Sequence, residues 1–344
     1  MKALSWIAAP LWPLQLVSGH KSFRANPLLG SPGLNRRGLH LARVSLAEKM
    51  AESRRKRLSA RIDPALKARY EANGYLVIKN FLPPDEFAAL KRDLEENPLR
   101  SWERREGSTV TRPGSLDLPD IEGRAALERL MTGHRISDLL RYLAGCGGEP
   151  LIHLQTILAE GDAARPDPQN TLHMDTFHST AKSWLYLQDV GEEDGPLRYV
   201  PGSHRMTPAR LEWERELSIG AARNPDPEIA AGSFRVSDAM LEKLGYADAK
   251  ALAVPANTLV VPNTHGFHAR KASTRPTLRS EVYGSLRRNP FLPVSGMHLH
   301  SLPGLKGRLS TRQAQIDELL ARYLGVKGPW ISVPPKRIGD PASI

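Results

Sequence analysis

Two histidines and one aspartate, placed in two separate parts of the chain, constrain the fold most. His173 and Asp175 are two residues apart, and His268 follows much later in the sequence. On an extended strand, residues i and i+2 point to the same face, so the first two side chains can reach one point. The spacing therefore predicts a strand through residues 173–175. If His268 joins the pair, the fold must bring two distant segments together.

The His-x-Asp pair is weak evidence for a metal site when it is taken alone. The chain holds 11 histidines and 37 acidic residues, so such a pair arises by chance, and an ordinary hydrogen-bonded histidine explains it. Two imidazoles and one carboxylate are nevertheless the ligand set of non-haem iron(II) oxygenases, which leaves metal positions open for chemistry. The segments around the pair decide between these interpretations.

A strand signal and a dense turn signal follow the pair. Residues 184–187 (WLYL) lead into residues 195–204 (GPLRYVPGSH). Here the sequence resembles the phytanoyl-CoA dioxygenase family, whose members carry His-x-Asp, Gly-Pro-Leu with Pro-Gly-Ser-His, a distal His and an Arg. Residues 70–82 (YEANGYLVIKNFL), followed by two prolines and an expected helix, are similar to the family's N-terminal strand and helix. The resemblance covers about residues 63–300.

The resemblance implies a mainly β fold with flanking helices: a double-stranded β-helix, or jelly-roll, cupin-like barrel, with the site in its mouth. It implies an Fe(II)- and 2-oxoglutarate-dependent dioxygenase, assayed with ascorbate as reductant, that hydroxylates an unactivated carbon and releases succinate and carbon dioxide. His173, Asp175 and His268 are the expected metal ligands. An intact Asp175 favours hydroxylation over halogenation, because halogenating relatives lack the carboxylate, while desaturation or ring closure would use the same triad.

Two histidines, His265 and His268, compete for the distal ligand position. The family places its 2-oxoglutarate arginine eleven residues after the distal histidine, and Arg279 stands eleven residues after His268. Odd spacing on a strand also turns the two rings to opposite faces, so only one can point into a barrel. We therefore expect His268 to be the ligand and His265 to lie in the preceding turn or to line the pocket.

Three residues are candidates for binding the cosubstrate. Arg279 suits the distal carboxylate of 2-oxoglutarate, because a planar guanidinium pairs bidentately with a carboxylate and stays charged when buried. Gln155, on an expected strand over residues 151–158, and Trp184 match positions that contact the cosubstrate in some relatives. Softer candidates are Arg270, which lies near the expected distal ligand, and Phe177 and His178 for the substrate pocket, with packing an equal alternative for the last two.

Two rival functions come from other classes. A non-catalytic cupin-like metal- or ligand-binding protein would keep the barrel without 2-oxoglutarate turnover, and Arg279 argues against it. The net charge of +11 suggests a nucleic-acid-binding protein until it is divided along the chain. Residues 1–62 carry a net charge of +10, and the rest of the chain carries +1. The catalytic region is therefore nearly neutral, and no nucleic-acid partner is expected.

The chain divides into three predicted regions. Residues 1–62 form a basic, partly apolar N-terminal extension, residues 63–300 the dioxygenase domain, and residues 301–344 a helix (310–326) with a Pro-rich tail. Cys146 is the only cysteine, so no intrachain disulfide forms and a reducing compartment is favoured. The final Ala-Ser-Ile is not a peroxisomal address, which makes phytanoyl-CoA itself a doubtful substrate.

The N-terminal extension opens with an apolar run over residues 3–17 (ALSWIAAPLWPLQLV), which is shorter than the roughly 20 residues that span a bilayer. Its tryptophans and the following arginines predict peripheral membrane contact, and hence a lipid or acyl substrate among the small-molecule candidates. The expected location is cytoplasmic, on the cytoplasmic face of a membrane. A mitochondrial presequence, leading to the matrix, is the alternative, because Glu48 is the first acidic residue. A disordered or domain-packing extension is equally open.

Overall fold

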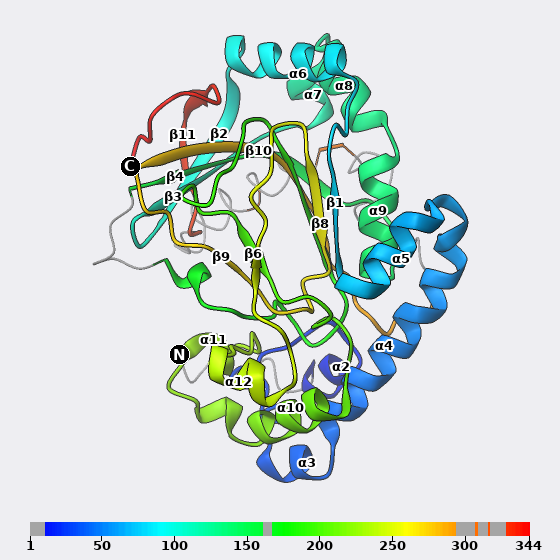
Figure 1. The fold of residues 1–344 in the computed structure, drawn as a ribbon. Coiled ribbons are helices and arrows are strands. Elements are labelled where there is room, and N and C mark those ends of the chain that lie inside the picture. The colour runs from blue at the N-terminus through cyan, green and yellow to red at the C-terminus, as the bar shows by residue number, and fades with distance from the viewer. Residues whose placement is uncertain (1–10, 161–166, 294–306, 309–315, 317–327) are drawn as a thin grey trace.

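Two antiparallel sheets form the centre of the molecule, and helices cover its outer sides (Figure 1). The computed structural model describes residues 11–160, 167–293, 307–308, 316 and 328–344. Within these residues, an eight-stranded sheet has the order β1-β8-β5-β10-β4-β3-β2-β11, and a three-stranded sheet has the order β7-β6-β9. The strands are β1 Tyr75–Ile78, β2 Leu99–Glu106, β3 Thr109–Gly114, β4 Leu151–Ala159, β5 Ala181–Tyr186, β6 Leu197–Tyr199, β7 Lys250–Ala251, β8 Leu259–Pro262, β9 His268–Arg270, β10 Thr277–Leu286 and β11 Ile331–Lys336.

The order of the strands confirms the predicted fold class. Apart from β2-β3-β4 and β6-β7, neighbours in the sheets are not neighbours in sequence, because the chain crosses repeatedly between the two sheets, as it does in a jelly roll. The ladders are antiparallel, for example between β10 and β4 and between β6 and β9. Among the described residues, hydrogen bonds do not close the sheets into one barrel, so the fold is an open form of the double-stranded β-helix.

The helices begin and end at local signals. Asp63 caps α5 by accepting from the amide of Ala65, and Thr207 caps α10 by accepting from the amide of Arg210. Proline occupies the first turn of several helices, where its missing amide proton costs nothing. The helices are α2 Trp12–Leu16, α3 Pro32–Arg36, α4 Leu39–Leu58, η2 Ser59–Arg61, α5 Pro64–Asn73, α6 Pro84–Glu96, α7 Leu118–Ile121, α8 Ala125–Thr132, α9 Arg135–Ala144, η3 Pro168–Asn170, α10 Pro208–Gly220, η4 Ala221–Arg223, α11 Pro227–Ala230 and α12 Asp238–Lys243.

Strand β5 shows how the larger sheet separates a core from a site. Ala181 and Leu185 belong to the hydrophobic core that includes Leu140 and Leu143 of α9. Successive side chains of a strand point to opposite faces, so Lys182 and the other alternate residues face away from α9. That second face carries the residues of the candidate site.

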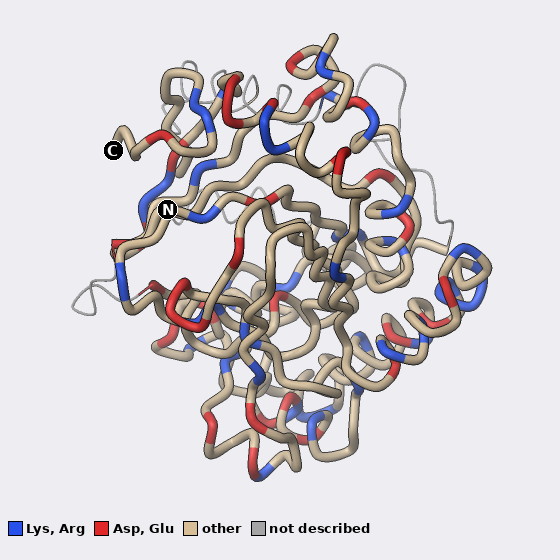
Figure 2. The backbone as a smooth tube through the Cα atoms, turned by 45° about the horizontal axis from the view of Figure 1, so that its top comes forward, with Lys and Arg blue, Asp and Glu red and all other residues tan. Residues whose placement is uncertain are grey.

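The basic side chains of residues 1–62 are partly built into the fold. Helix α4 packs against α9 and reaches α10 at the lower end of the molecule (Figure 1). The guanidinium of Arg54 is buried and donates to the carbonyls of Gly145, Pro290 and Leu292 at 2.7, 2.8 and 2.9 Å. Lys and Arg are interspersed with Asp and Glu along the backbone (Figure 2). No helix of the described residues is long and apolar enough to cross a membrane.

The C-terminal tail contributes a strand that the sequence pattern did not predict. Strand β11 pairs with β2 at the edge of the larger sheet, and its register shifts between Val333 and Lys336, where two prolines stand. Proline is tolerated on an edge strand because the missing amide proton faces solvent. The predicted helix over residues 310–326 lies outside the described residues, apart from Ile316.

The contact between α4 and the end of α9 should depend on Gly145. Its φ of +58° favours glycine, and an added Cβ would lie 2.7 Å from the Cβ of Ala51. We expect Gly145→Ala to destabilise the fold by about 1–3 kcal/mol more than Gly245→Ala, because of overpacking. Gly245 is the matched control, since its φ is +75° but nothing lies within 4 Å. Urea unfolding measures both, and equal losses would show that α4 does not press on this turn.

Candidate functional site

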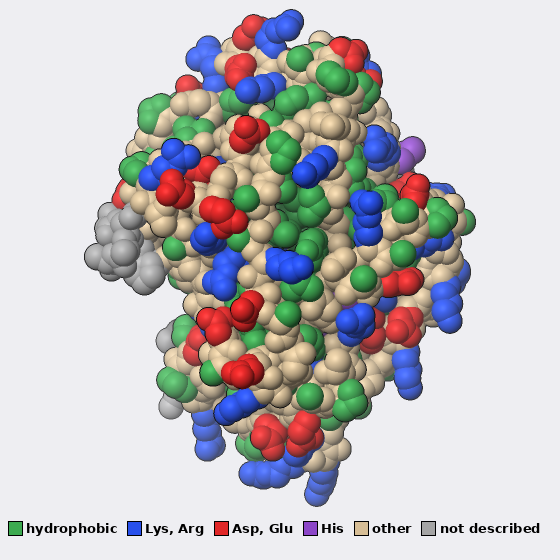
Figure 3. Space-filling model, viewed as in Figure 1, with side chains coloured by type: hydrophobic (Ala, Val, Ile, Leu, Met, Phe, Trp, Pro, Cys, Tyr) green, Lys and Arg blue, Asp and Glu red, His purple; other side chains and the backbone are tan. Residues whose placement is uncertain are grey.

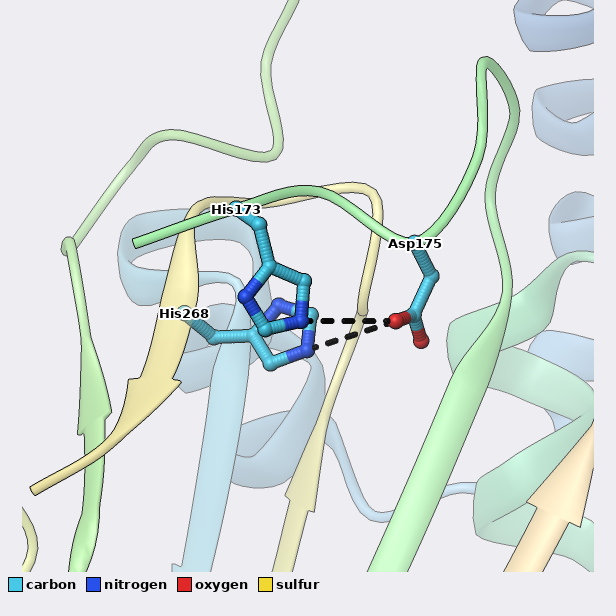
Figure 4. Close-up of side chains that lie close together, drawn as sticks. All are labelled: His173, Asp175 and His268. Atoms are coloured by element: carbon cyan, nitrogen blue, oxygen red, sulfur yellow. Dashed lines mark ion pairs between the residues drawn. The ribbon is translucent and has the colours of Figure 1, made fainter. Parts of the chain in front are cut away.

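Three side chains converge on one point between the sheets (Figure 4). The Nε2 atom of His173 lies 3.8 Å from Oδ1 of Asp175, and Nε2 of His268 lies 3.7 Å from the same oxygen. One ligand atom from each residue lies within 4.8 Å of the others, and no second group of this kind occurs among the described residues. The structure therefore brings the three predicted ligands together.

Backbone hydrogen bonds place the three ligands. His173 and His268 exchange two such bonds, each 2.9 Å long, and the amide of Asp175 donates to the carbonyl of Thr264 at 2.9 Å. The prediction of a strand through residues 173–175 was wrong, because His173 forms an isolated bridge and Asp175 lies in a bend. The alternation still holds, since the amide of Met174 turns away and donates to Phe234. Backbone hydrogen bonds to distant segments therefore orient His173 and Asp175 toward the same point, as a regular strand was expected to do.

Both imidazoles have the tautomer and the neutral charge that binding a metal through Nε2 requires. Nδ1 of His173 lies 2.7 Å from the carbonyl of Thr171, and Nδ1 of His268 lies 3.0 Å from that of Gly266. A carbonyl only accepts, so each Nδ1 carries the proton and each Nε2 offers a lone pair. Burial lowers the pKa of His268 to about 3 and also lowers the pKa of His173. Both rings are therefore neutral at ordinary pH.

Lys182 holds the carboxylate ligand ionised. Its Nζ atom lies 2.8 Å from Oδ2 of Asp175, which leaves Oδ1 facing the two histidines. Burial acts to raise the pKa of Asp175, but the charge of Lys182, followed by His268 and His173, outweighs burial and holds the pKa well below its usual range. Sequence analysis missed Lys182, although it lies two residues before the predicted Trp184 and alternation on β5 could have indicated it.

A cavity of about 180 Å³ is lined by the two candidate metal-ligand histidines and by the predicted cosubstrate residues. Gln155, Trp184, Arg270 and Arg279 all line it, as do Lys182 and Trp330. The complete lining is Arg104, Glu106, Thr111, Gln155, Gln169, His173, Lys182, Trp184, Tyr186, Leu197, His268, Ala269, Arg270, Arg279, Tyr283 and Trp330. Arg104 and Trp330 were not predicted, because the strand pairing of β2 with β11 places them there.

Arg279 is buried and oriented by its neighbours. Its Nε donates to Glu281 at 3.0 Å, and its Nη1 donates to the carbonyls of Asp194, at 3.2 Å, and Gly195. Among the described residues, its Nη2 has no hydrogen-bond acceptor. Burial acts to lower the pKa of Arg279, but the charge and hydrogen bond of Glu281, together with Tyr186 and Asp194, outweigh burial, and the pKa is raised. The guanidinium is therefore a fixed cation in the cavity wall, with donors left for a carboxylate.

The remaining sequence candidates lie elsewhere. His265 is fully buried in the turn before β9 and does not join the metal cluster, and neither of its ring nitrogens has a hydrogen-bond partner in the described part of the chain. Phe177 and His178 do not line the cavity. The Phe177 ring lies 4.1 Å from the guanidinium carbon of Arg43, so this residue is a packing residue. The His178 ring packs against that of Phe177, with the ring centroids 4.9 Å apart.

The donor set fits divalent iron. Two neutral imidazoles and one ionised carboxylate oxygen lie close enough to share an ion, and the histidines border an open cavity. This is the facial arrangement that leaves positions for a cosubstrate. The residue that would receive the far end of a dicarboxylate, Arg279, lines the same cavity.

Replacing Lys182 should make metal binding depend more steeply on pH. In Lys182→Met, burial alone would raise the pKa of Asp175, so protons would compete with the metal as the pH falls from 7.5 to 5.5. We expect the Kd for Fe(II) to rise by about 10-fold or more at the acidic end, as it does when outer partners of ligands are lost. Anaerobic titration measures this, with exposed Lys250→Met as control. Tighter binding would mean that repulsion between Lys182 and the metal dominates.

Comparison with known proteins identifies the family. The phytanoyl-CoA dioxygenase (PhyH) profile matches residues 70–240. Ectoine dioxygenase of Stutzerimonas stutzeri (strain A1501) is 23% identical over 248 residues, covering 65% of this chain and 76% of that protein. The solved epimerase SnoN of nogalamycin biosynthesis has a TM-score of 0.41 and 23% identity, covering 65% of this chain and 83% of its own. HygX of Streptomyces hygroscopicus, solved with nickel and 2-oxoglutarate, has a TM-score of 0.41 and 17% identity, covering 65% and 86%.

The family match and the geometry support each other. The matched residues include His173 and Asp175 but end before His268 and Arg279, which the fold brings to the same cavity. The two structural similarities are too distant to carry an argument about this chain. On the strength of the profile match, the chain belongs to the phytanoyl-CoA dioxygenase family of iron(II)- and 2-oxoglutarate-dependent oxygenases.

Proposed function

We propose that this 2-oxoglutarate-dependent dioxygenase hydroxylates an unactivated carbon of a small, polar molecule and releases succinate and carbon dioxide. The observation that carries the proposal is the single cavity that His173, His268 and Arg279 line together. The intact Asp175 carboxylate supports hydroxylation over halogenation.

Each protein group has a defined task in this proposal. His173, Asp175 and His268 would hold the iron, and Arg279 would receive the distal carboxylate of 2-oxoglutarate through its free Nη2. Gln155 supports this arrangement indirectly, because its amide donates to Glu281 at 3.0 Å and thereby orients the partner of Arg279. Bound iron and 2-oxoglutarate supply the oxidising chemistry.

The size and charge of the cavity support a small polar substrate. Its volume of about 180 Å³ lies below the roughly 300–1,000 Å³ of pockets for drug-sized ligands. Each cation in its wall has an acidic partner. The ion pairs are Arg104 with Glu106, Lys182 with Asp175, Arg270 with Asp167 and Arg279 with Glu281. A balanced wall that offers aromatic and hydrogen-bonding groups favours a substrate of low net charge.

Turnover of 2-oxoglutarate tests this function. Purified protein with ferrous iron and ascorbate should form succinate, and His173→Ala should abolish it. Arg279→Lys keeps the charge but loses the planar, two-pronged hydrogen-bonding group. We therefore expect the KM for 2-oxoglutarate to rise about 10- to 100-fold, which corresponds to the loss of one charged hydrogen bond of about 1.5–3 kcal/mol. Arg69→Ala, on exposed α5, is the matched control. No succinate from the wild type would leave a metal- or ligand-binding protein as the alternative.

We also propose, separately from the choice of substrate, that the N-terminal segment contacts a membrane surface. Three apolar side chains at α2 support this, because Leu11, Leu14 and Val17 are 52%, 64% and 62% exposed. The face shown in Figure 3 mixes acidic, basic and hydrophobic side chains. The proposed membrane contact rests on these three apolar side chains.

Vesicle sedimentation tests the membrane contact. Changing Leu11, Leu14 and Val17 to serine should remove most of the vesicle-bound fraction, because each buried apolar side chain contributes about 1.5–3 kcal/mol. The control is Leu46→Ser, since Leu46 is 50% exposed on α4 but lies outside the patch. Equal partitioning of the wild type and the triple variant would refute the contact.

A further inference from the structure

We propose that residues 18–62, which we name the N-terminal clasp, hold the metal ligands in position. Lys21 is the residue of the clasp that positions Asp175. The clasp lies before the residues that the family profile matches. The inference rests on the proposed function only in taking His173, Asp175 and His268 as the metal ligands. It gives the basic N-terminal segment a task in catalysis that is separate from membrane contact.

Lys21 forms a hydrogen bond with the backbone of Asp175, one of the three candidate ligands. Its Nζ donates to the main-chain carbonyl of Asp175 at 2.6 Å and also to Oγ of Ser233, which itself donates to that carbonyl at 3.3 Å. On the other side, the amide of Asp175 donates to Thr264. Both polar groups of this residue's backbone are thus fixed, one of them by a side chain more than 150 positions away.

The clasp is seated closely enough to hold Lys21 in place. The φ of Gly232 is +87°, and a Cβ there would lie 2.3 Å from the carbonyl oxygen of Lys21, so only glycine lets the two chains approach. The amide of Arg24 then donates to the carbonyl of Ala230 at 3.0 Å. Residues 21–24 therefore run directly along residues 230–233.

A buried charge network connects the clasp to both ligand segments. His40 of α4 contacts Glu214 at 2.9 Å, and Glu214 accepts from Nε of Arg210 at 3.1 Å. The Nη2 of Arg210 donates to the carbonyl of His265 at 2.7 Å and to Sδ of Met174 at 3.3 Å. Arg210 and Glu214 are fully buried, so their geometry is tightly constrained. Arg210 thus contacts both Met174, which lies between two of the ligands, and the turn before the third ligand, His268.

A third contact fixes the chain that leaves Asp175. Arg55 of α4 donates to Oγ of Ser179 at 2.6 Å, and the side-chain amide of Asn263 donates to the same oxygen at 3.1 Å. Arg43 covers the ring of Phe177. The clasp therefore touches the segment carrying His173 and Asp175 on several sides, and it reaches the turn before His268 through Arg210 and Asn263.

Metal affinity distinguishes positioning from simple stabilisation. Outer partners of metal ligands change affinity about 10- to 100-fold, whereas a residue that only supports the fold changes stability and not affinity. Lys21→Met removes both hydrogen bonds, Lys21→Arg retains donors at the same place, and exposed Lys49→Met on α4 is the matched control. Ser233→Ala removes the second donor to the Asp175 carbonyl and one hydrogen-bond acceptor of Lys21, while Lys21 keeps its hydrogen bond to that carbonyl.

The experiment is anaerobic Fe(II) titration of the full chain without 2-oxoglutarate, together with thermal unfolding of the metal-free protein. We expect Lys21→Met to raise the Kd by about 10-fold, Lys21→Arg and Lys49→Met to stay near the wild type, and Ser233→Ala to shift the Kd in the same direction. If Lys21→Met and Ser233→Ala lower the unfolding midpoint but keep the wild-type Kd, the inference is overturned. If the wild type binds Fe(II) no better than His173→Ala, the proposed function itself fails.

Discussion

The pair of backbone hydrogen bonds between His173 and His268 is the interaction on which the site depends. It joins two segments far apart in sequence, and it sets both Nε2 atoms against one oxygen of Asp175. Each imidazole is then locked by a carbonyl two residues away, so the ligands are oriented before any metal arrives. Such preorganisation lowers the cost of ordering flexible side chains when the metal binds.

Charge balance is the second constraint around the cavity. A buried unpaired charge is strongly destabilising, so each cation in the wall is matched by a carboxylate. Each ion pair also engages one polar atom of a side chain and leaves another atom of the same side chain available. Lys182 occupies one oxygen of Asp175 and leaves the other for the metal, while Glu281 occupies Nε of Arg279 and leaves Nη2 for a ligand. The same pairs that make burial tolerable therefore also select which atoms remain reactive.

The N-terminal segment shows that composition can hide two different roles. Its arginines suggest a charged, solvent-exposed arm, yet Arg54 and Arg55 are taken up by carbonyl and hydroxyl acceptors of the catalytic domain. The apolar side chains at α2 remain exposed, and they alone keep the membrane proposal open. A basic stretch is therefore anchored to the rest of the fold where the fold supplies hydrogen-bond acceptors for it.

The sequence by itself determined the ligand types, the family, the fold class and the caps of several helices, because motif spacing, alternation and capping are local properties. It also predicted that Gln155, Trp184 and Arg279 belong with the metal ligands, and all three line the cavity. Only the tertiary structure decided that residues 173–175 form no regular strand, that β11 closes the sheet edge, and that Lys21 grips Asp175. These features rest on hydrogen bonds between segments far apart in the chain, and local propensity carries no information about such partners.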